Sequence, residues 1–318
     1  MKARIPDAAS DPRHLFLHRH TYDHMRTITT TLRLLVMLTA TTLIGCNTGS
    51  AQSTLEKIGQ LHLNALDGSV TTYYPDGYRE RATSVADLLA ASTGFFEQEF
   101  GVRETFSIAV LDSASWVKVT EIPYGLPFVS GPPNVVCLPA TSNHELAETI
   151  AASIAEHDLD SKHGMSNREI VTLFTDLIGF HELGHVYTWA SGIPTPNKWI
   201  DEFAATYMAW AYLDKTFPKG AQIWVDAAHA LASEIHPGHT SLSEFEARYV
   251  RVGIRNYAWY QSVFLLRVRE VYELEGIDFL GKMKNRNWSS TAGIYFLDDM
   301  EEMVPGFATW ARTYRLVE

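Results

Sequence analysis

The chain has 318 residues, 46% of them hydrophobic, with 37 acidic against 26 basic residues and a formal net charge of −11. This length and hydrophobic content are enough for a buried core and one main folded unit. An acidic chain lacks the basic surface that binds phosphate backbones, so nucleic acid is excluded as the expected partner.

The N-terminal part has the pattern of a secretory signal. Residues 25–46 begin with Met25 and Arg26, run through a modest apolar stretch, and end Leu-Ile-Gly-Cys at Cys46. The apolar stretch is too short for a stable membrane span. Its ending is similar to the lipobox of bacterial lipoproteins, and this resemblance implies cleavage before Cys46 and a lipid on that cysteine. An ordinary signal peptide and a chance cysteine remain the alternatives.

These features predict four segments along the chain. Residues 1–24 fit neither a signal nor a domain, so we expect the true start at Met25. Residues 25–46 are then the lipoprotein signal peptide, 47–60 a small, polar tether, and 61–318 the folded domain. The lipid would attach the mature protein to a membrane in the bacterial cell envelope, outside the cytoplasm. Cys137 is the only other cysteine, so no disulfide within the chain is expected.

The sequence of the first half of the domain predicts a mixture of strands and helices. Strands are expected at residues 70–74, 106–111 and 134–138, an amphipathic helix at 79–100, and another helix at 143–157. If the strand at 134–138 lies beside the helix predicted at 168–190, which carries the metal-binding motif, it could pair with an extended peptide along its edge. An ordinary internal strand is an equal alternative.

Residues 181–185 read His-Glu-Leu-Gly-His within a stretch of helical periodicity, 168–190, that Ser166 or Asn167 can cap. Two histidines four apart lie on one face of a helix and can bind one metal ion, while Glu182 flanks the water on that metal. Zinc suits such ligands and lowers the pKa of its water to about 7, so Glu182 would act as general base. Gly184 costs a helix about 1 kcal/mol relative to alanine, which predicts close approach of a neighbouring strand or substrate backbone.

A third ligand is expected from a second helix, 199–217, which Asn197 can cap. Its first turn holds Asp201 and Glu202, and the helix dipole favours an ionised acid there. Thr188 and Ser191 stand where the longer metzincin motif requires glycine and histidine, so that ligand set is excluded. An ordinary acidic first turn is the alternative.

The segments His181–His185 and Trp199–Ala209 make the chain similar to the gluzincin zinc peptidases, the group of thermolysin and the zinc aminopeptidases, and most of all to their compact peptidase MA-like branch. The resemblance covers about residues 65–318. It implies one zinc ion held by His181, His185 and Glu202, with Asp201 a minor alternative. It also implies a zincin-like α+β fold: a small mixed αβ N-terminal lobe packed on a mainly helical C-terminal lobe, with the zinc cleft between them.

The resemblance further implies a tyrosine, at the start of a late helix, that stabilises the oxyanion of the reaction. Tyr260 is the first choice and Tyr257 the second, because tyrosines three residues apart lie on the same helix face; a purely packing role is the alternative. The helix itself is expected at 260–275. Further helices are expected at 241–251 and 307–314. The glutamate with which zinc aminopeptidases hold a free amine has no counterpart here, so aminopeptidase activity is not supported.

The leading hypothesis is therefore a lipid-anchored, extracytoplasmic zinc peptidase that acts on peptides or proteins. A non-catalytic, zinc-containing envelope protein is the second hypothesis, although a structural site has no need of Glu182. Zinc-dependent hydrolysis of another acyl bond is the third.

Overall fold

The structure is a computed structural model that describes residues 52–289 and 296–317. The chain divides into residues 1–51 and residues 52–318, and every described helix and strand belongs to the second unit. The predicted signal peptide, the lipidation at Cys46 and the proposed start at Met25 lie outside the described residues.

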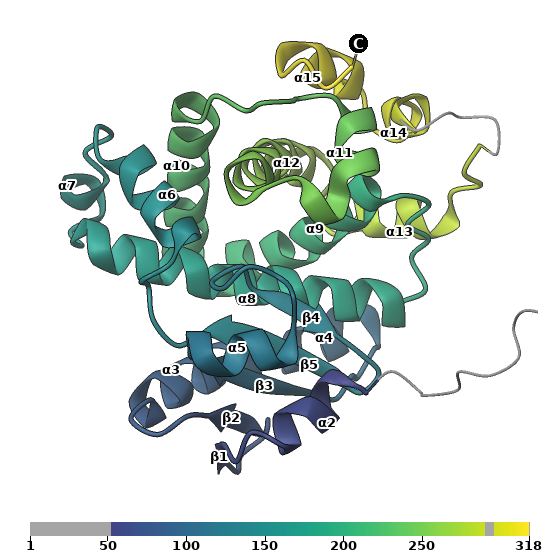
Figure 1. Cartoon of the computed structure of the whole chain (residues 1–318). Coiled ribbons are helices and arrows are strands. Elements are labelled where there is room, and N and C mark those ends of the chain that lie inside the picture. The colour runs from purple at the N-terminus through teal and green to yellow at the C-terminus, as the bar shows by residue number, and fades with distance from the viewer. Residues whose placement is uncertain (1–51, 290–295, 318) are drawn as a thin grey trace, which may run out of the picture. The chain divides into compact units, whose positions relative to one another are not determined.

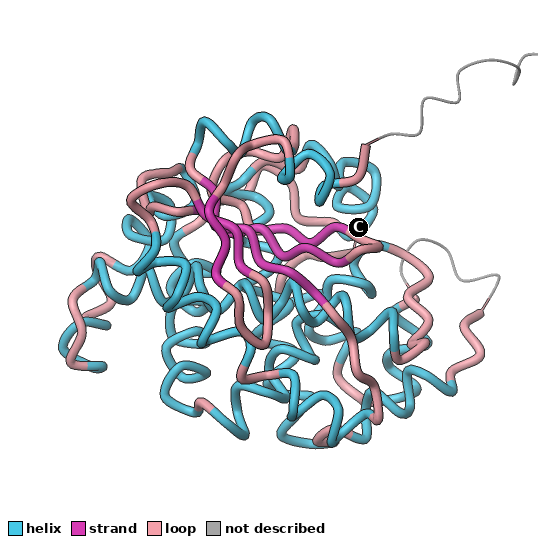
Figure 2. Tube along the Cα trace, turned by 90° about the horizontal axis from the view of Figure 1, so that it is seen from below, coloured by secondary structure: helices cyan, strands magenta, loops and turns pink. Residues whose placement is uncertain are grey.

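One five-stranded sheet is built from the first third of this unit, in the order β1-β2-β3-β5-β4 (Figures 1 and 2). The strands are β1 (Asn64–Leu66), β2 (Thr72–Tyr74), β3 (Phe106–Leu111), β4 (Phe128–Ser130) and β5 (Asn134–Pro139). The three middle strands run parallel, and β1 and β4 are antiparallel edge strands. The predicted strands 106–111 and 134–138 are confirmed, and 70–74 is shortened to β2. The prediction missed β1 and β4, which have only three residues each.

Of the two alternatives left open for the strand 134–138, the ordinary internal strand is the one that the structure has. This strand, β5, pairs with β3 on one side and with β4 on the other, and its residues are buried from Val135 onward. The edge that lies beside the motif helix is β4, because both β4 and β5 contact that helix but β4 ends the sheet.

Shorter helices accompany the sheet: α2 (Thr54–Gly59), α3 (Arg79–Ala90), α4 (Thr93–Phe100) and α5 (Ser113–Val119). The single helix predicted at 79–100 is thus two helices. The chain turns at Ser92, whose hydroxyl donates a 2.7 Å hydrogen bond to the carbonyl of Leu89 and so competes with helix continuation.

From residue 145 on, every regular element in the described part of the chain is a helix. Its elements are α6 (Glu145–Ile154), α7 (Leu159–His163), α8 (Asn167–Ala190), α9 (Lys198–Thr216), α10 (Pro218–Glu234), α11 (Leu242–Arg248), η1 (Tyr249–Arg251), α12 (Ile254–Glu275), α13 (Asp278–Asn285), α14 (Leu297–Met303) and α15 (Phe307–Thr313). The helices predicted at 143–157, 168–190, 199–217, 241–251, 260–275 and 307–314 correspond to α6, α8, α9, α11 with η1, α12 and α15. The architecture is therefore α+β and mainly helical, as predicted.

Helix α8 lies at the centre of the unit. In Figure 1 it separates the sheet from the layer of α9, α10 and α12, and it contacts β4, β5, α6, α9 and α10. Ser166 and Glu169 form a capping box at its start, in which each side chain accepts from the other residue's backbone N–H. Asn197 caps α9 by accepting from the N–H of Ile200. Both predicted helix starts are confirmed.

In the described ranges, no helix is both long and apolar enough to span a membrane.

Candidate metal centre

The residues of the motif meet Glu202 because α8 and α9 pack very closely. A Cβ built on Gly184 would overlap the carbonyl oxygen of Ala205 and lie 2.8 Å from its carbonyl carbon. The glycine is therefore required by the backbone of a neighbouring helix, and the expectation of a strand or a substrate backbone at this point is corrected.

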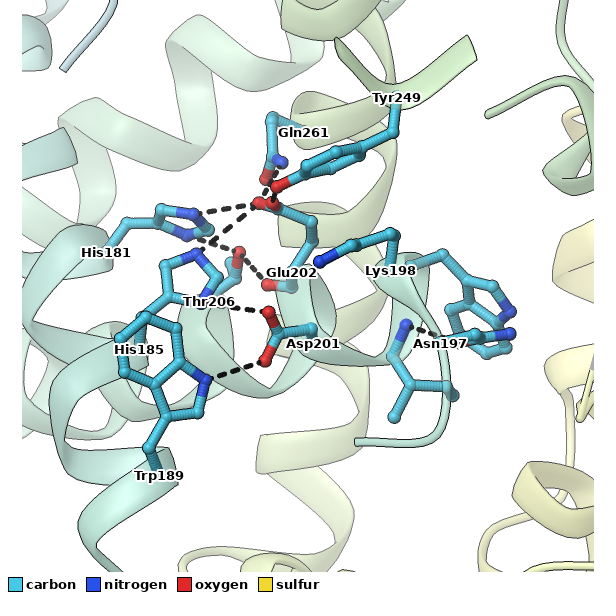
Figure 3. A network of polar contacts seen from close by, with 12 residues as sticks. His181, His185, Trp189, Asn197, Lys198, Asp201, Glu202, Thr206, Tyr249 and Gln261 are labelled. Atoms are coloured by element: carbon cyan, nitrogen blue, oxygen red, sulfur yellow. Dashed lines mark hydrogen bonds and ion pairs between the residues drawn. The ribbon is translucent and has the colours of Figure 1, made fainter. Parts of the chain in front are cut away.

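His181, His185 and Glu202 form one buried cluster whose ligand atoms lie within 4.8 Å of one another (Figure 3). Nε2 of His181 is 3.0 Å and Nε2 of His185 is 3.8 Å from Oε2 of Glu202. Ligands placed tetrahedrally at about 2.1 Å from one zinc ion would be about 3.4 Å apart. The two observed distances bracket that value, so this group can hold a metal ion.

The Glu202 carboxylate is fully buried, and its hydrogen bonds explain how the fold tolerates the charge. Tyr257 donates to Oε2 at 2.9 Å and Gln261 at 2.6 Å, and Tyr249 donates to Oε1 (Figure 3 shows Tyr249 and Gln261). Burial raises the pKa of Glu202, but contacts with the two histidines hold it well below the ordinary value. The carboxylate is thus ionised, as a metal ligand must be.

The far ring nitrogens of the histidines also face polar groups. Nδ1 of His181 lies 3.0 Å from the hydroxyl of Thr206, which itself donates to the carbonyl oxygen of Glu202. Nδ1 of His185 lies 3.6 Å from Oδ2 of Asp201, and the Trp189 indole donates to the other oxygen of that carboxylate at 3.2 Å. Partners of this kind fix ring orientation in metal sites. Asp201, the minor alternative as ligand, therefore lies behind His185.

The pKa values of the two histidines are shifted in opposite directions. Burial lowers the pKa of His181 below its ordinary value. Burial also opposes the charged form of His185, but Asp201 and Glu202 raise the pKa of this ring well above the ordinary value. Metal binding at His185 would therefore displace a proton.

These observations test whether the residues fit a metal. Nδ1 of His185 is buried and its nearest acidic oxygen, Oδ2 of Asp201 at 3.6 Å, is too far for a hydrogen bond, while Nε2 faces the shared oxygen of Glu202. Two imidazoles and one carboxylate are a donor set that zinc takes in open, three-ligand sites. The donor set and its convergence fit one divalent ion.

Glu182 borders two cavities, a wide cleft and a smaller pocket. Burial raises its pKa to about 8, against the opposing effects of the His185 charge and of the backbone of Val129 in β4. Glu182, the residue expected to act as general base, thus lies on the side of α8 that faces the edge strand β4.

The expectation that Tyr260 faces the metal ligands is wrong. Its ring is fully buried and its hydroxyl donates to the carbonyl of Ser241 at 2.8 Å. Tyr257, the second choice, is the residue whose hydroxyl reaches Glu202. Tyr257 lies about one helical turn before Tyr260 on α12.

Three contributing residues were missed by the sequence analysis. Tyr249 and Gln261 lie 47 and 59 positions from Glu202, and no local pattern links them to it. Thr206 lies four positions after Glu202 on α9, so helical spacing could have placed it beside the ligands.

The wide cleft, about 1520 Å³ including space open to solvent, runs along this centre. One wall is the segment 120–129 that leads into β4. The other is formed by α8, α9 and residues 249–257. A chain entering it would pass Glu182, His185 and Glu202.

Comparison of the chain with protein-family models, with curated proteins and with solved structures finds no match.

Proposed function

We propose that this protein hydrolyses peptide bonds with the help of one zinc ion held by His181, His185 and Glu202. The observation that carries the proposal is the convergence of these three buried side chains next to Glu182 and a wide cleft. A structural site is closed by protein ligands, whereas this cluster has three and borders open space.

The reaction would add water across an amide and leave a carboxylate and an amine. A bound zinc ion would supply Lewis acidity for the carbonyl and acidify the attacking water. Glu182 would hold the proton taken from that water and pass it to the leaving nitrogen. Tyr257 donates its one hydroxyl proton to Oε2 of Glu202, so it could serve developing negative charge only if a bound metal ion took that oxygen and freed the hydroxyl.

A peptide is favoured as substrate by the position of β4. Within the described residues β4 pairs only with β5, so its other edge keeps backbone groups for an added strand. Phe128 and Val129 of β4 line the wide cleft together with Glu182, so this edge lies beside the groups that would react. An extended chain paired with β4 would present its amides to Glu182.

The family and the location of the protein are further proposals, and each rests on a sequence motif: the family on His181–His185 and the location on the lipobox-like ending. The chain would be a zincin-like, gluzincin-type peptidase. It would be lipid-anchored through Cys46 and act outside the cytoplasm, as the lipobox-like ending of residues 25–46 indicates.

Replacing Glu182 with glutamine tests the proposal. The isosteric amide cannot accept the proton, so zinc content should equal that of wild type while hydrolysis of a peptide library falls at least about 100-fold. Glu148→Gln, the same change at an exposed position of α6, is the control and should retain wild-type turnover. Undiminished turnover by Glu182→Gln would refute the role of Glu182, and a zinc-loaded wild type that cleaves nothing would favour the non-catalytic alternative.

A further inference from the structure

The wall of the wide cleft that α9 and residues 249–257 form carries two cations. Lys198, the first residue of α9, and Arg251, the last residue of η1, both line the cleft, and both side chains are exposed. Apart from the residues of the metal centre, the other charged residue among the described lining is Glu121, on the opposite wall. In a chain with a net charge of −11, this side of the cleft is therefore unusually positive.

Lys198 lies close to the metal ligands. It precedes Glu202 by four residues on α9, so the two side chains lie on the same face of the helix. The Lys198 ammonium is 5.2 Å from the centre of the Tyr249 ring, and the Tyr249 hydroxyl donates to Glu202. Figure 3 shows Lys198 and Tyr249 beside this carboxylate. A group held by Lys198 would therefore lie next to a substrate that is bound at the metal.

The acidic groups around Lys198 are engaged by other donors. Glu202 has the contacts described above, Asp201 accepts from an indole N–H, and Glu246 accepts two backbone N–H groups at the start of α9. Neither Lys198 nor Arg251 forms an ion pair with another described residue. Both charges are therefore available to a ligand in the cleft.

The start of α12 adds to the positive field at this wall. The helix begins after Gly253, which lines the cleft and has no side chain to cap the first N–H groups. Its first turn contains no acidic residue. The N-terminal end of a helix carries partial positive charge and favours an anion beside it. Arg251 lies two residues before Gly253, so its charge and the helix dipole act on the same part of the cleft.

The anionic group that an unmodified peptide offers to such a wall is a carboxylate, at its C-terminus or on an aspartate or glutamate. The guanidinium of Arg251 can donate two parallel hydrogen bonds to a carboxylate, and the ammonium of Lys198 supplies a compact charge. About 620 Å³ of the cleft is free for a ligand, which is in the range of small-ligand sites. The cleft can therefore hold a peptide backbone and a charged group together.

We propose that Lys198 and Arg251 form a subsite for a carboxylate of the peptide substrate, supplied by its C-terminus or by an acidic side chain near the cleaved bond. The inference rests on the proposed function and adds to it a substrate class. The substrate backbone lies along β4, and its carboxylate reaches across the cleft to α9 and η1. Glu121, on the wall that leads into β4, repels a carboxylate and so disfavours the reversed placement.

Four peptides of one sequence test this subsite: they end in a free carboxylate or an amide, and each carries glutamate or glutamine near the cleaved bond. Ion pairs between partly exposed groups are modest, so the preferred carboxylate should raise kcat/KM about 5- to 20-fold at low salt. The preference should shrink toward one in about 1 M sodium chloride, which screens the charges. Preference for the free C-terminus identifies the terminal carboxylate, and preference for glutamate identifies the side chain. Equal kcat/KM for all four peptides would overturn the inference.

Variants of the two cations test whether they cause the preference. Lys198→Met and Arg251→Met should each lower it about 2- to 5-fold, and the double variant should bring it close to one, whereas Lys198→Arg keeps the charge and should keep the preference. Lys284→Met and Arg312→Met are the matched controls, because these exposed cations do not line the cleft, and they should keep the wild-type ratio. An unchanged ratio in the Lys198 and Arg251 variants, in folded protein that hydrolyses peptides, would contradict the subsite and leave the proposed function intact.

A binding measurement separates the two failures. Calorimetric titration of zinc-loaded Glu182→Gln protein with the four peptides should show tighter binding of the preferred carboxylate peptide and loss of that preference when Lys198→Met and Arg251→Met are added. If wild type hydrolyses no peptide but this preference is present, the proposed function fails and the carboxylate subsite stands. A preference that survives the loss of both cations would assign the carboxylate to the metal, and this result, like equal binding of all four peptides, contradicts the inference.

Discussion

The effect of Gly184→Ala on the free energy of unfolding should distinguish two contributions: the close packing of α8 against α9 and the intrinsic helix propensity of the residue. In an open helical position, alanine replaces glycine with a gain of about 0.8–1 kcal/mol. At Gly184 the new methyl group would overlap the Ala205 carbonyl and lie 3.0 Å from the Ala205 Cα. These neighbours are backbone atoms, so they cannot rotate away as a flexible side chain can.

The overlap must be relieved by moving α8 and α9 apart. Overpacking of a dense core costs about 1–3 kcal/mol, so the net effect of Gly184→Ala is a loss of about 0–2 kcal/mol where propensity alone predicts a gain. Gly281→Ala is the control: Gly281 lies in α13 with nothing within 4 Å of an added Cβ, and the change there should stabilise the protein by up to about 1 kcal/mol. Urea unfolding of the three proteins measures both values.

The same movement would draw Glu202 away from His181 and His185, because Ala205 and Glu202 belong to one helix. We therefore expect the zinc affinity of Gly184→Ala to fall at least about tenfold, the scale found when the support of a ligand is disturbed, and that of Gly281→Ala to stay unchanged. A Gly184→Ala protein that is stabilised like Gly281→Ala and binds zinc like wild type would refute the close packing of the two helices.

Two further changes test other parts of the structure. Tyr249→Phe removes one hydroxyl that donates to Glu202 and should weaken zinc binding about tenfold in a competition titration, whereas Tyr260→Phe, whose hydroxyl serves the Ser241 carbonyl, should not; equal effects would contradict the assigned contacts. Burial, and secondarily the charge of Arg81, lowers the pKa of His144 from 6.5 to about 4, so the unfolded chain takes up a proton that the folded chain excludes. This ring should therefore cost up to about 3 kcal/mol of stability as pH falls from about 6.5 to about 4. His144→Asn keeps an acceptor for the N–H of Ala147 and should flatten that part of the stability profile, and an unaltered slope would count against the buried neutral ring.

The elements that carry the site were predictable because their signals are local. The capping box of Ser166 and Glu169 and the cap at Asn197 set the starts of α8 and α9, and helical spacing put both histidines on one face. The meeting of these helices was implied by the third ligand expected on the second helix, and the structure brings Glu202 to His181 and His185. Gly184 predicted that another backbone comes close to the helix, but it could not show which one. A glycine leaves space without indicating what fills it.

What the sequence could not supply depends on tertiary contacts. Tyr249 and Gln261 reach Glu202 from distant segments that have no periodic relation to it. Tyr257 and Tyr260 share a helix face, and only the packing of α12 decides that the first reaches Glu202 and the second Ser241. A three-residue edge strand such as β4 leaves no clear pattern of alternation.

The central claim is that His181, His185 and Glu202 bind one metal ion together. Elemental analysis of the purified full-length protein tests it most directly, in wild type and in Glu202→Ala. We expect about one zinc per chain in wild type and a large loss of zinc from a folded Glu202→Ala protein. Wild-type protein without a stoichiometric divalent metal, even after incubation with zinc, or an equal zinc content in the variant, would contradict the claim.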